Sequence, residues 1–246
     1  MQVKRRIFAG ATCDQIVYET NNGARAPGDK RPRMRFKDEY ERAEHRRQIS
    51  KRRHARTINE NYGPTSLYST LTMNSENECH DYEEARQLRD LYYRKLHRAF
   101  PEAKINIYMG QGKHTHRFHF HMLTDGIPEE FIRSKWTYGE NIRIEHLREH
   151  NYYDGEDHGR DYTALANYLF DHWTPEQGKG KRYKQSMTVR PPKPEEATEC
   201  LRRYSPARPP ITPKGYKYIG CDYNLYGYMN FHYVIIPPKD DSRRRC

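Results

Sequence analysis

Four of the thirteen histidines of this 246-residue chain stand within eight positions, in the segment HTHRFHFHML (114–123). Side chains in a β-strand alternate between the two faces of a sheet, so His119 and His121 would share one face and the neighbouring apolar residues the other. Residues two apart on one face lie about 6.5–7 Å apart at Cα, which lets both imidazoles reach one metal ion. The spacing predicts a metal site at His119 and His121, whereas His114 and His116 have the opposite parity.

A tyrosine follows these histidines in a segment with a helical pattern, RDYTALANYLFDHW (160–173). Leu165, Leu169 and Trp173 repeat at four-residue intervals and predict a buried stripe, with Tyr168 at its edge. Tyrosine is a weak nucleophile at neutral pH because its pKa is about 10, and a metal ion that polarises a scissile phosphate offsets part of this weakness. The combination predicts phosphoryl transfer to a tyrosine.

These groups need a scaffold, and the sequence pattern indicates which elements supply it. Asp81 and Glu84 form a capping-box pattern, and Pro101 ends the helix that they begin. The order of elements after residue 62 predicts an α+β fold in which an antiparallel sheet carries helices on one face. Helices are expected at residues 36–61, 81–100, 128–136 and 160–173, and strands at residues 66–73, 104–109, 117–123 and 141–147.

Composition divides the chain into four parts. Residues 1–62 combine a loose arm with a basic helix, and residues 63–190 hold the candidate catalytic groups. Seven prolines predict a linker over residues 191–214. Residues 215–246 contain two alternating aromatic runs about the segment DYNLYG and end in a basic tail, which predicts a C-terminal β-hairpin.

The formal net charge is +11, with 44 basic against 33 acidic residues, and it favours a polyanionic partner such as nucleic acid. Residues 30–56 alone hold 12 of the basic and 4 of the acidic residues. We therefore expect this segment to contact DNA rather than to serve only as a solvated helical face. The contacting residues would be Arg46, Arg47, Lys51, Arg52, Arg53 and Arg56.

Cysteine usage and hydropathy indicate the compartment. The five cysteines are scattered without a CxxC pair, which fits a reducing cytoplasm and argues against a zinc knuckle or a disulfide framework. No apolar run approaches the roughly 20 residues that span a bilayer, and the basic start lacks the apolar stretch of a signal peptide. We expect a cytoplasmic protein without a membrane partner.

The order of these motifs resembles that of the HUH endonucleases, and within them the rolling-circle replication initiators of bacterial plasmids, phages and integrated elements. HFH (119–121) resembles the His-hydrophobe-His metal motif, SLYSTLT (66–72) the first-strand motif, and ANYLFDHW (166–173) the tyrosine helix. GKRYKQSMTVRPP (180–192) is similar to a basic segment that follows this helix in relatives. The resemblance covers residues 65–192, and its motif order favours an initiator, because relaxases usually carry the tyrosine before the HUH motif.

The resemblance implies a ferredoxin-like, RRM-like HUH fold for residues 63–190 and an enzyme that nicks single-stranded origin DNA. Tyr168 would attack the scissile phosphate, leaving a 5′-phosphotyrosine and a free 3′-OH, and the strands would later be rejoined. The sequence contains no GxxxxGK[ST] motif, so a host helicase would unwind the DNA and a host polymerase would extend it. The implied location is the cytoplasm of a bacterial host.

The implied ligand set and the tyrosine motif depart from the family pattern in two places. His119 and His121 would hold Mg²⁺ or Mn²⁺ with Gln111 as the third ligand. Strand alternation turns Gln111 toward the core, however, unless Gly110 forms a bulge. Single-tyrosine initiators often read YxxK, and here Asp171 takes the lysine position.

Other groups are candidates for the remaining roles. His172 lies one helical turn beyond Tyr168 and is the candidate for the missing cation or proton-transfer group, with a plain helix-end histidine as the alternative. Tyr162 is the alternative nucleophile, about 120° away around the helix. By the resemblance, Lys181 and Arg182 would add DNA contacts.

The sequence leaves three alternatives open. A single-strand transposase or a relaxase would use the same metal and tyrosine for a different biological end. A catalytically inactive DNA-binding relative would keep the sheet and lose the chemistry, as the departure at Asp171 allows. A structural or zinc-storing site would use all four clustered histidines, with tight Zn²⁺ binding that does not depend on Tyr168.

Overall fold

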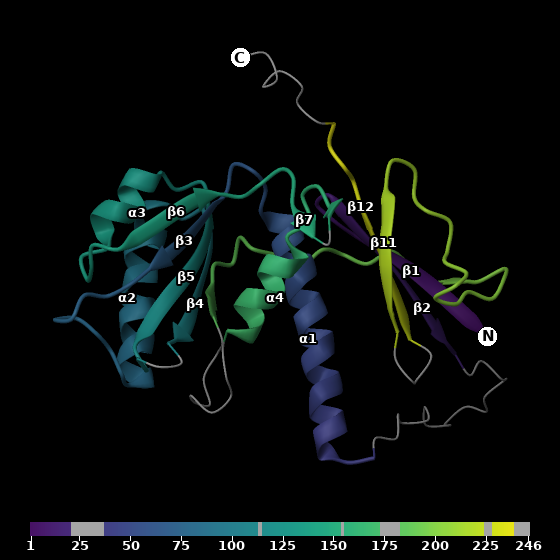
Figure 1. The fold of residues 1–246 in the computed structure, drawn as a ribbon, viewed down its shortest axis with the longest axis horizontal. Coiled ribbons are helices and arrows are strands. Elements are labelled where there is room, and N and C mark those ends of the chain that lie inside the picture. Colours follow the sequence, from purple (N-terminus) through teal and green to yellow (C-terminus); the bar gives the residue numbers. More distant parts are fainter. Residues whose placement is uncertain (21–36, 113–114, 154, 173–182, 224–227, 239–246) are drawn as a thin grey trace.

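Helices and sheets alternate in layers across the molecule (Figure 1). The computed structural model describes residues 1–20, 37–112, 115–153, 155–172, 183–223 and 228–238. Helices α1 and α4 lie between two five-stranded antiparallel sheets, and α2 and α3 cover the outer face of one of these sheets. The sequence predictions for His114, Trp173, Lys181 and Arg182 fall outside the described residues.

The two sheets differ in which parts of the chain they use. The first, here the histidine sheet, has the strand order β6-β3-β5-β4-β9, and the second, here the terminal sheet, has the order β10-β1-β2-β12-β11. The strands of the histidine sheet are β3 (Leu67–Leu71), β4 (Lys104–Gln111), β5 (Phe118–Asp125), β6 (Ile142–His146) and β9 (Tyr183–Gln185). Those of the terminal sheet are β1 (Gln2–Ala9), β2 (Thr12–Glu19), β10 (Thr198–Glu199), β11 (Lys217–Tyr223) and β12 (Met229–Val234).

Four helices and a small hairpin complete the described part of the chain. The helices are α1 (Glu39–Asn61), α2 (Tyr82–Ala99), α3 (Glu129–Lys135) and α4 (Thr163–Asp171), and the hairpin is β7 (Tyr152–Tyr153) with β8 (Glu156–Asp157). Within the described residues, no helix combines the length and the apolar character needed to cross a membrane.

Helix α2 covers the apolar face of the histidine sheet. It begins where the Asp81 side chain accepts hydrogen bonds from the backbone N–H groups of Glu83 and Glu84, at 2.9 and 3.0 Å. These bonds satisfy donors that the first helical turn leaves open. Tyr92 of α2 and Phe120 of β5 are buried in the same apolar cluster, so this face of the sheet is closed to solvent.

Helices cover both faces of the histidine sheet, and the prediction of helices on one face is wrong. Ala55 of α1 and Ala166 of α4 share a second buried cluster with Tyr108 and Leu123, which lie on the opposite face from α2. Leu123 continues the histidine side of β5 as an apolar residue, so this face also needs a cover. The coarser class holds: the fold is α+β with antiparallel sheets and, among the described residues, four helices.

The N-terminal residues form a β-hairpin and not the loose arm that their composition predicts. Strands β1 and β2 pair along their whole length, and β2 also pairs with β12 near the other end of the chain. Residues 12–17 of β2 are buried on both faces of the strand, so they lack the apolar-polar alternation that marks a strand in a sequence. Part of the proline-rich segment joins the same sheet as β10, next to β1. The aromatic hairpin expected after residue 215 is present as β11 and β12.

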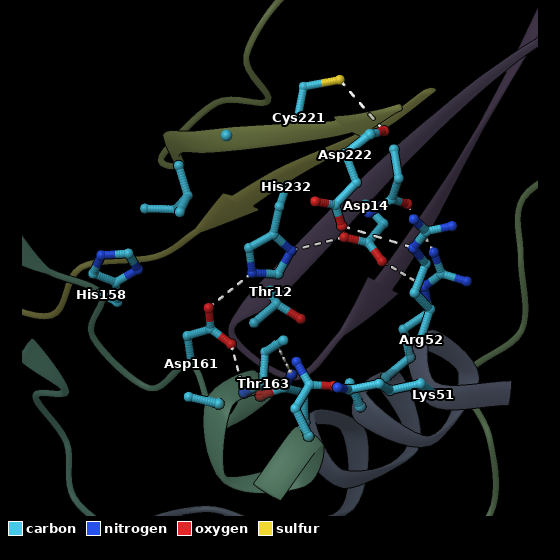
Figure 2. Close-up of a pocket in the computed structure, with 18 of the residues that line it drawn as sticks. Thr12, Asp14, Lys51, Arg52, His158, Asp161, Thr163, Cys221, Asp222 and His232 are labelled. Atoms are coloured by element: carbon cyan, nitrogen blue, oxygen red, sulfur yellow. Dashed lines mark hydrogen bonds and ion pairs between the residues drawn. The ribbon is translucent and has the colours of Figure 1, made fainter. Parts of the chain in front are cut away.

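A buried ionic cluster ties the terminal sheet to the start of α4 (Figure 2). His232 of β12 lies between two carboxylates, with Nδ1 2.7 Å from Asp14 Oδ1 and Nε2 2.8 Å from Asp161 Oδ2. Arg56 of α1 pairs with Asp14 and donates a hydrogen bond to the Asn230 side chain at 2.8 Å. The cluster therefore joins β2, β12 and α1 to the segment that leads into α4.

Protonation of His232 contributes to the stability of this cluster. Burial acts to lower the pKa of His232, but hydrogen bonds to Asp14 and Asp161 outweigh burial and raise the pKa to about 10. Burial acts to raise the pKa of both carboxyls, and hydrogen bonds to His232 hold each pKa below the ordinary value of 3.8. The imidazolium stabilises the fold fully below its unfolded pKa of 6.5, and this contribution is lost as the pH rises through about 10. The carboxylates contribute above about pH 4 and lose this contribution as the pH falls further.

Replacing His232 with alanine is expected to lower the free energy of unfolding by about 3–5 kcal/mol, because two buried carboxylates lose their shared cation. The difference from wild type should be smaller at about pH 9 than at about pH 6, because above pH 6.5 the unfolded chain has released the proton that folded wild type keeps on His232. Urea unfolding at the two pH values measures both effects. The exposed His146→Ala is the control, and an equal loss at both pH values would contradict a charged His232.

Candidate metal and tyrosine site

Three histidines from two elements converge on one point. The register of β4 and β5 pairs Gly110 with His119 and Tyr108 with His121, so both histidines lie on the face covered by α1 and α4. His172, directly after α4, completes the group, and one ring nitrogen of each histidine lies within 4.8 Å of those of the other two. Nε2 of His119 and Nε2 of His172 are 2.8 Å apart. The three imidazoles form a candidate metal centre.

The neighbouring strand orients His121. Its Nδ1 lies 2.8 Å from the Tyr68 hydroxyl and 3.3 Å from the Thr70 hydroxyl, both on β3. An Nδ1–H that donates to these oxygens leaves the lone pair of Nε2 facing His119 and His172. Such a hydrogen bond behind a ligating histidine fixes its tautomer and its ring orientation. The segment SLYSTLT thus supplies the hydrogen-bond support for a candidate ligand, a role that its alternation alone did not reveal.

All three histidines are held in the neutral form. Burial, reinforced by His172, lowers the pKa of His119 to about 4. Burial, reinforced by the other two histidines, lowers the pKa of His121 to about 3, and burial also lowers the pKa of His172. A neutral imidazole is the form that binds a metal ion. The donor set is therefore ready for a metal at neutral pH.

A glycine leaves the space that the third histidine occupies. A Cβ placed on Gly110 would overlap the ring of His172 and lie 2.8 Å from Nε2 of His119. We expect Gly110→Ala to displace His172 and to weaken Mn²⁺ binding at least about tenfold, as loss of groups that orient a ligand does. Titration of Mn²⁺ followed by electron paramagnetic resonance measures the affinity. Gly63→Ala is the matched control, because a Cβ there meets no atom within 4 Å. Equal affinities in the two variants would exclude this role of Gly110.

Gln111 does not join the histidines. It pairs with Phe118 across β4 and β5, which places it on the apolar side of the sheet. Its side-chain amide donates a hydrogen bond to the backbone carbonyl of His116 at 2.8 Å. No bulge at Gly110 shifts the register, so the alternation that turned Gln111 away from the histidine face holds. His172 replaces Gln111 as the third candidate ligand.

The side chain of Tyr168 stands at the rim of this centre. Its hydroxyl lies 3.4 Å from Nε2 of His121, and 47% of the residue is exposed to solvent. Together with Tyr68, Thr70 and Arg143 it lines an open groove of about 660 Å³. Burial raises the pKa of Tyr168, so the hydroxyl keeps its proton at neutral pH. A tyrosine hydroxyl that is accessible and next to a metal centre can act as a nucleophile once a neighbouring charge assists it.

Tyr162 is not placed for this chemistry. Only 2% of the residue is exposed, and its hydroxyl donates a hydrogen bond to the carbonyl of Arg148 at 3.0 Å. Burial raises its pKa to about 12. The alternative nucleophile is therefore a core residue of the layer between α4 and the histidine sheet.

Two cations from α1 surround the acidic residue of the tyrosine helix. Nη2 of Arg47 lies 2.5 Å from Asp171 Oδ1, and Lys51 pairs with the other oxygen of the same carboxylate. Asp171 occupies the position that is lysine in the family pattern, and it pairs with Lys51 of α1. A lysine is therefore still present at that end of α4. Sequence reasoning missed this pairing because the partners are 120 and 124 residues apart.

The other basic residues of α1 fall into two groups. Arg46 in the N-terminal half of α1 and Arg53 in its C-terminal half are both exposed. The N-terminal end of the helix extends beyond both sheets (Figure 1). The side chain of Arg52 is 23% exposed and lies 3.7 Å from the Asp222 carboxylate. That of Arg56 is 14% exposed and faces Asp14. The structure therefore places Arg56 in the interior and removes it from the predicted DNA-contacting set.

Comparison of the chain with protein-family models, with curated proteins and with solved structures finds no match in any of the three.

Proposed function

We propose that this protein is a metal-dependent tyrosine endonuclease of the HUH type that initiates rolling-circle DNA replication. One observation carries the proposal: the hydroxyl of an exposed tyrosine lies 3.4 Å from a ring nitrogen of a three-histidine cluster. Two further observations support it. The groove beside Tyr168 is open, as a strand of DNA requires, and a helix with exposed arginines stands nearby.

The donor set fits a catalytic metal centre better than a structural one. Structural zinc sites use four protein ligands, whereas catalytic sites use three and keep a position open. Among the described residues, His119, His121 and His172 supply three, and His116 is exposed outside this group. Between the two ions that the resemblance implies, Mn²⁺ fits better, since imidazoles bind first-row transition ions and Mg²⁺ prefers oxygen ligands. Bound there, the ion would supply positive charge to a scissile phosphate oxygen.

In the proposed reaction, Oη of Tyr168 forms a bond to phosphorus as the bond between phosphorus and the 3′-oxygen breaks. The tyrosine hydroxyl releases its proton to the solvent in the open groove, and the departing 3′-oxygen takes up a proton. The products are a 5′-phosphotyrosine and a free 3′-OH, which a host polymerase would extend. Attack by a 3′-OH on the phosphotyrosine reverses these steps and rejoins the strands without another energy source.

Single-stranded DNA tiled across the region of the encoding gene tests this proposal. Wild-type protein is incubated with each labelled tile and either Mn²⁺ or EDTA, and the products are resolved on a denaturing gel. We expect a covalent protein–DNA adduct on one tile that forms with Mn²⁺ and not with EDTA. Binding without an adduct on any tile would favour the catalytically inactive relative instead.

The exposed arginines of α1 are expected to add affinity that depends on salt. Arg46→Gln with Arg53→Gln should lower the slope of log K against log salt concentration by roughly 0.7 for each lost phosphate contact, without moving the cleavage position. Fluorescence anisotropy with labelled single-stranded DNA measures the slope. The paired control is Arg94→Gln with Arg98→Gln on the exposed side of α2. An unchanged slope, or a cleavage position that moves, would show that α1 has another role.

A further inference from the structure

A second cavity lies on the other side of the tyrosine helix. It has a volume of about 420 Å³ and lies between α1, α4 and the terminal sheet. Figure 2 shows Lys51 and Arg52 on one side of it, His158 on the other, and His232 between Asp14 and Asp161. This volume is in the range of pockets that enclose small organic ligands. The cavity is separate from the groove that Tyr168 lines.

The charges that line this cavity favour an anionic group at one side. The carboxylates of Asp14 and Asp161 are already engaged by His232, and Asp14 also by Arg56. Lys51 and Arg52 retain partial access to solvent, with side chains 20% and 23% exposed. Each has one acidic partner near the surface, and a phosphate can exchange with such a partner. A phosphate is the anion that suits neighbouring Lys and Arg side chains.

The wall formed by α4 offers groups that can recognise a base. Asn167 lines the cavity, and its side chain makes no hydrogen bond to another described residue. Its amide has two donors and an acceptor, the set that pairs with the edge of a nucleobase. Tyr153 and His158 line the same cavity and contact each other edge to face, with ring centroids 5.1 Å apart. Aromatic rings of this kind provide surfaces for a base.

The position of the cavity relates it to the proposed reaction. Asn167 directly precedes Tyr168, so a single helical turn presents one side chain to the cavity and the other to the groove. A helix with its side chains is about 10–12 Å across. A strand whose phosphate lies at Tyr168 can therefore reach the cavity with a nucleotide that is only a few positions away.

We propose that this cavity binds one unpaired nucleotide, with its base against Asn167 and its phosphate at Lys51 and Arg52. This inference rests on the proposed function, which makes single-stranded DNA the source of that nucleotide. A free nucleotide carries the same chemistry, so the experiment has one arm for each source.

The first arm measures binding of dAMP, dCMP, dGMP and dTMP to the full chain in EDTA by isothermal titration calorimetry, with inorganic phosphate as the comparison. We expect one or more nucleotides to bind at least about tenfold more tightly than phosphate. Ala164→Trp, which fills the cavity from α4, should weaken this binding at least tenfold. Ala99→Trp at the exposed end of α2 is the matched control. Nucleotide binding that is no tighter than phosphate, or that survives Ala164→Trp, would overturn the proposal.

The second arm uses single-stranded DNA with 2-aminopurine at successive positions, again in EDTA. We expect the fluorescence to change sharply at one position on binding to wild type, and to lose this change in Ala164→Trp. Asn167→Leu, a near-isosteric change, repeats the test in case the tryptophan variant unfolds. A signal from free nucleotides alone would overturn the assignment of the strand as the source.

Both arms are independent of nicking, because they are carried out without metal. Tyr168→Phe should leave nucleotide binding unchanged. If the adduct never forms but nucleotides still bind in the cavity, the proposed reaction fails and the cavity assignment stands. If the adduct forms and the cavity variants bind nucleotides as wild type does, the cavity assignment fails and the reaction stands.

Discussion

Replacing Tyr168 with phenylalanine is expected to abolish the covalent protein–DNA adduct and to lower nicking by on the order of 10³-fold or more, since the only change is the loss of the attacking oxygen. The phenyl ring keeps the packing of the tyrosine, whose ring centroid lies 5.5 Å from that of His121 and 5.1 Å from that of His172. DNA affinity should therefore stay within about twofold of wild type. A denaturing gel measures the adduct, and fluorescence anisotropy measures binding.

The matched control for this prediction is Tyr162→Phe on the same helical segment. It removes a buried hydroxyl that donates to the Arg148 carbonyl, so it should cost roughly 0.5–1.5 kcal/mol of stability. The adduct should persist at the wild-type level. An adduct that survives Tyr168→Phe would place the nucleophile on another residue.

Removing one histidine of the cluster is expected to have the second largest effect. His172→Ala should weaken Mn²⁺ binding and nicking by at least about 100-fold, because it deletes one of the three candidate ligands and not merely a residue behind a ligand. Gln111→Ala should change both by less than about threefold, since Gln111 lies on the opposite face of the sheet. Electron paramagnetic resonance of free Mn²⁺ and the yield of adduct measure the two effects.

The comparison of His172→Ala with Gln111→Ala distinguishes the third ligand that the structure suggests from the one that the family resemblance implies. The resemblance implies Gln111 as the third ligand, whereas the structure places His172 beside His119 and His121 as the third candidate. His116→Ala is the control for loss of a nearby exposed histidine. A larger loss in Gln111→Ala than in His172→Ala would contradict the assignment of the third ligand to His172.

The local sequence pattern was sufficient to predict that His119 and His121 share one face of a strand. Because side chains alternate strictly along a strand, His119 and His121 had to share a face, and the register with β4 shows that they do. The same alternation predicted that Gln111 lies on the opposite face and is not a metal ligand. The start of α2 could also be predicted from the local sequence, because the Asp81 side chain accepts hydrogen bonds from two backbone N–H groups within the next three residues.

Long-range pairing explains what the sequence did not reveal. The third histidine comes from a helix end 51 residues after His121, and Gly110 leaves the space for it. The pairing of β2 with β12 joins opposite ends of the chain. The same holds for Lys51 and Asp171, which no local pattern connects. In each case a residue acquires its role from a partner that only the fold brings near.

The most direct measurement of the central claim is mass spectrometry of the adduct formed by wild-type protein with single-stranded DNA and Mn²⁺. The DNA is trimmed with a nuclease, the protein is digested, and the modified peptide is sequenced. We expect the nucleotide on Tyr168, attached through its 5′-phosphate, and a free 3′-OH on the released strand. A nucleotide on any other residue, or DNA binding with no adduct at all, would contradict the proposed tyrosine chemistry.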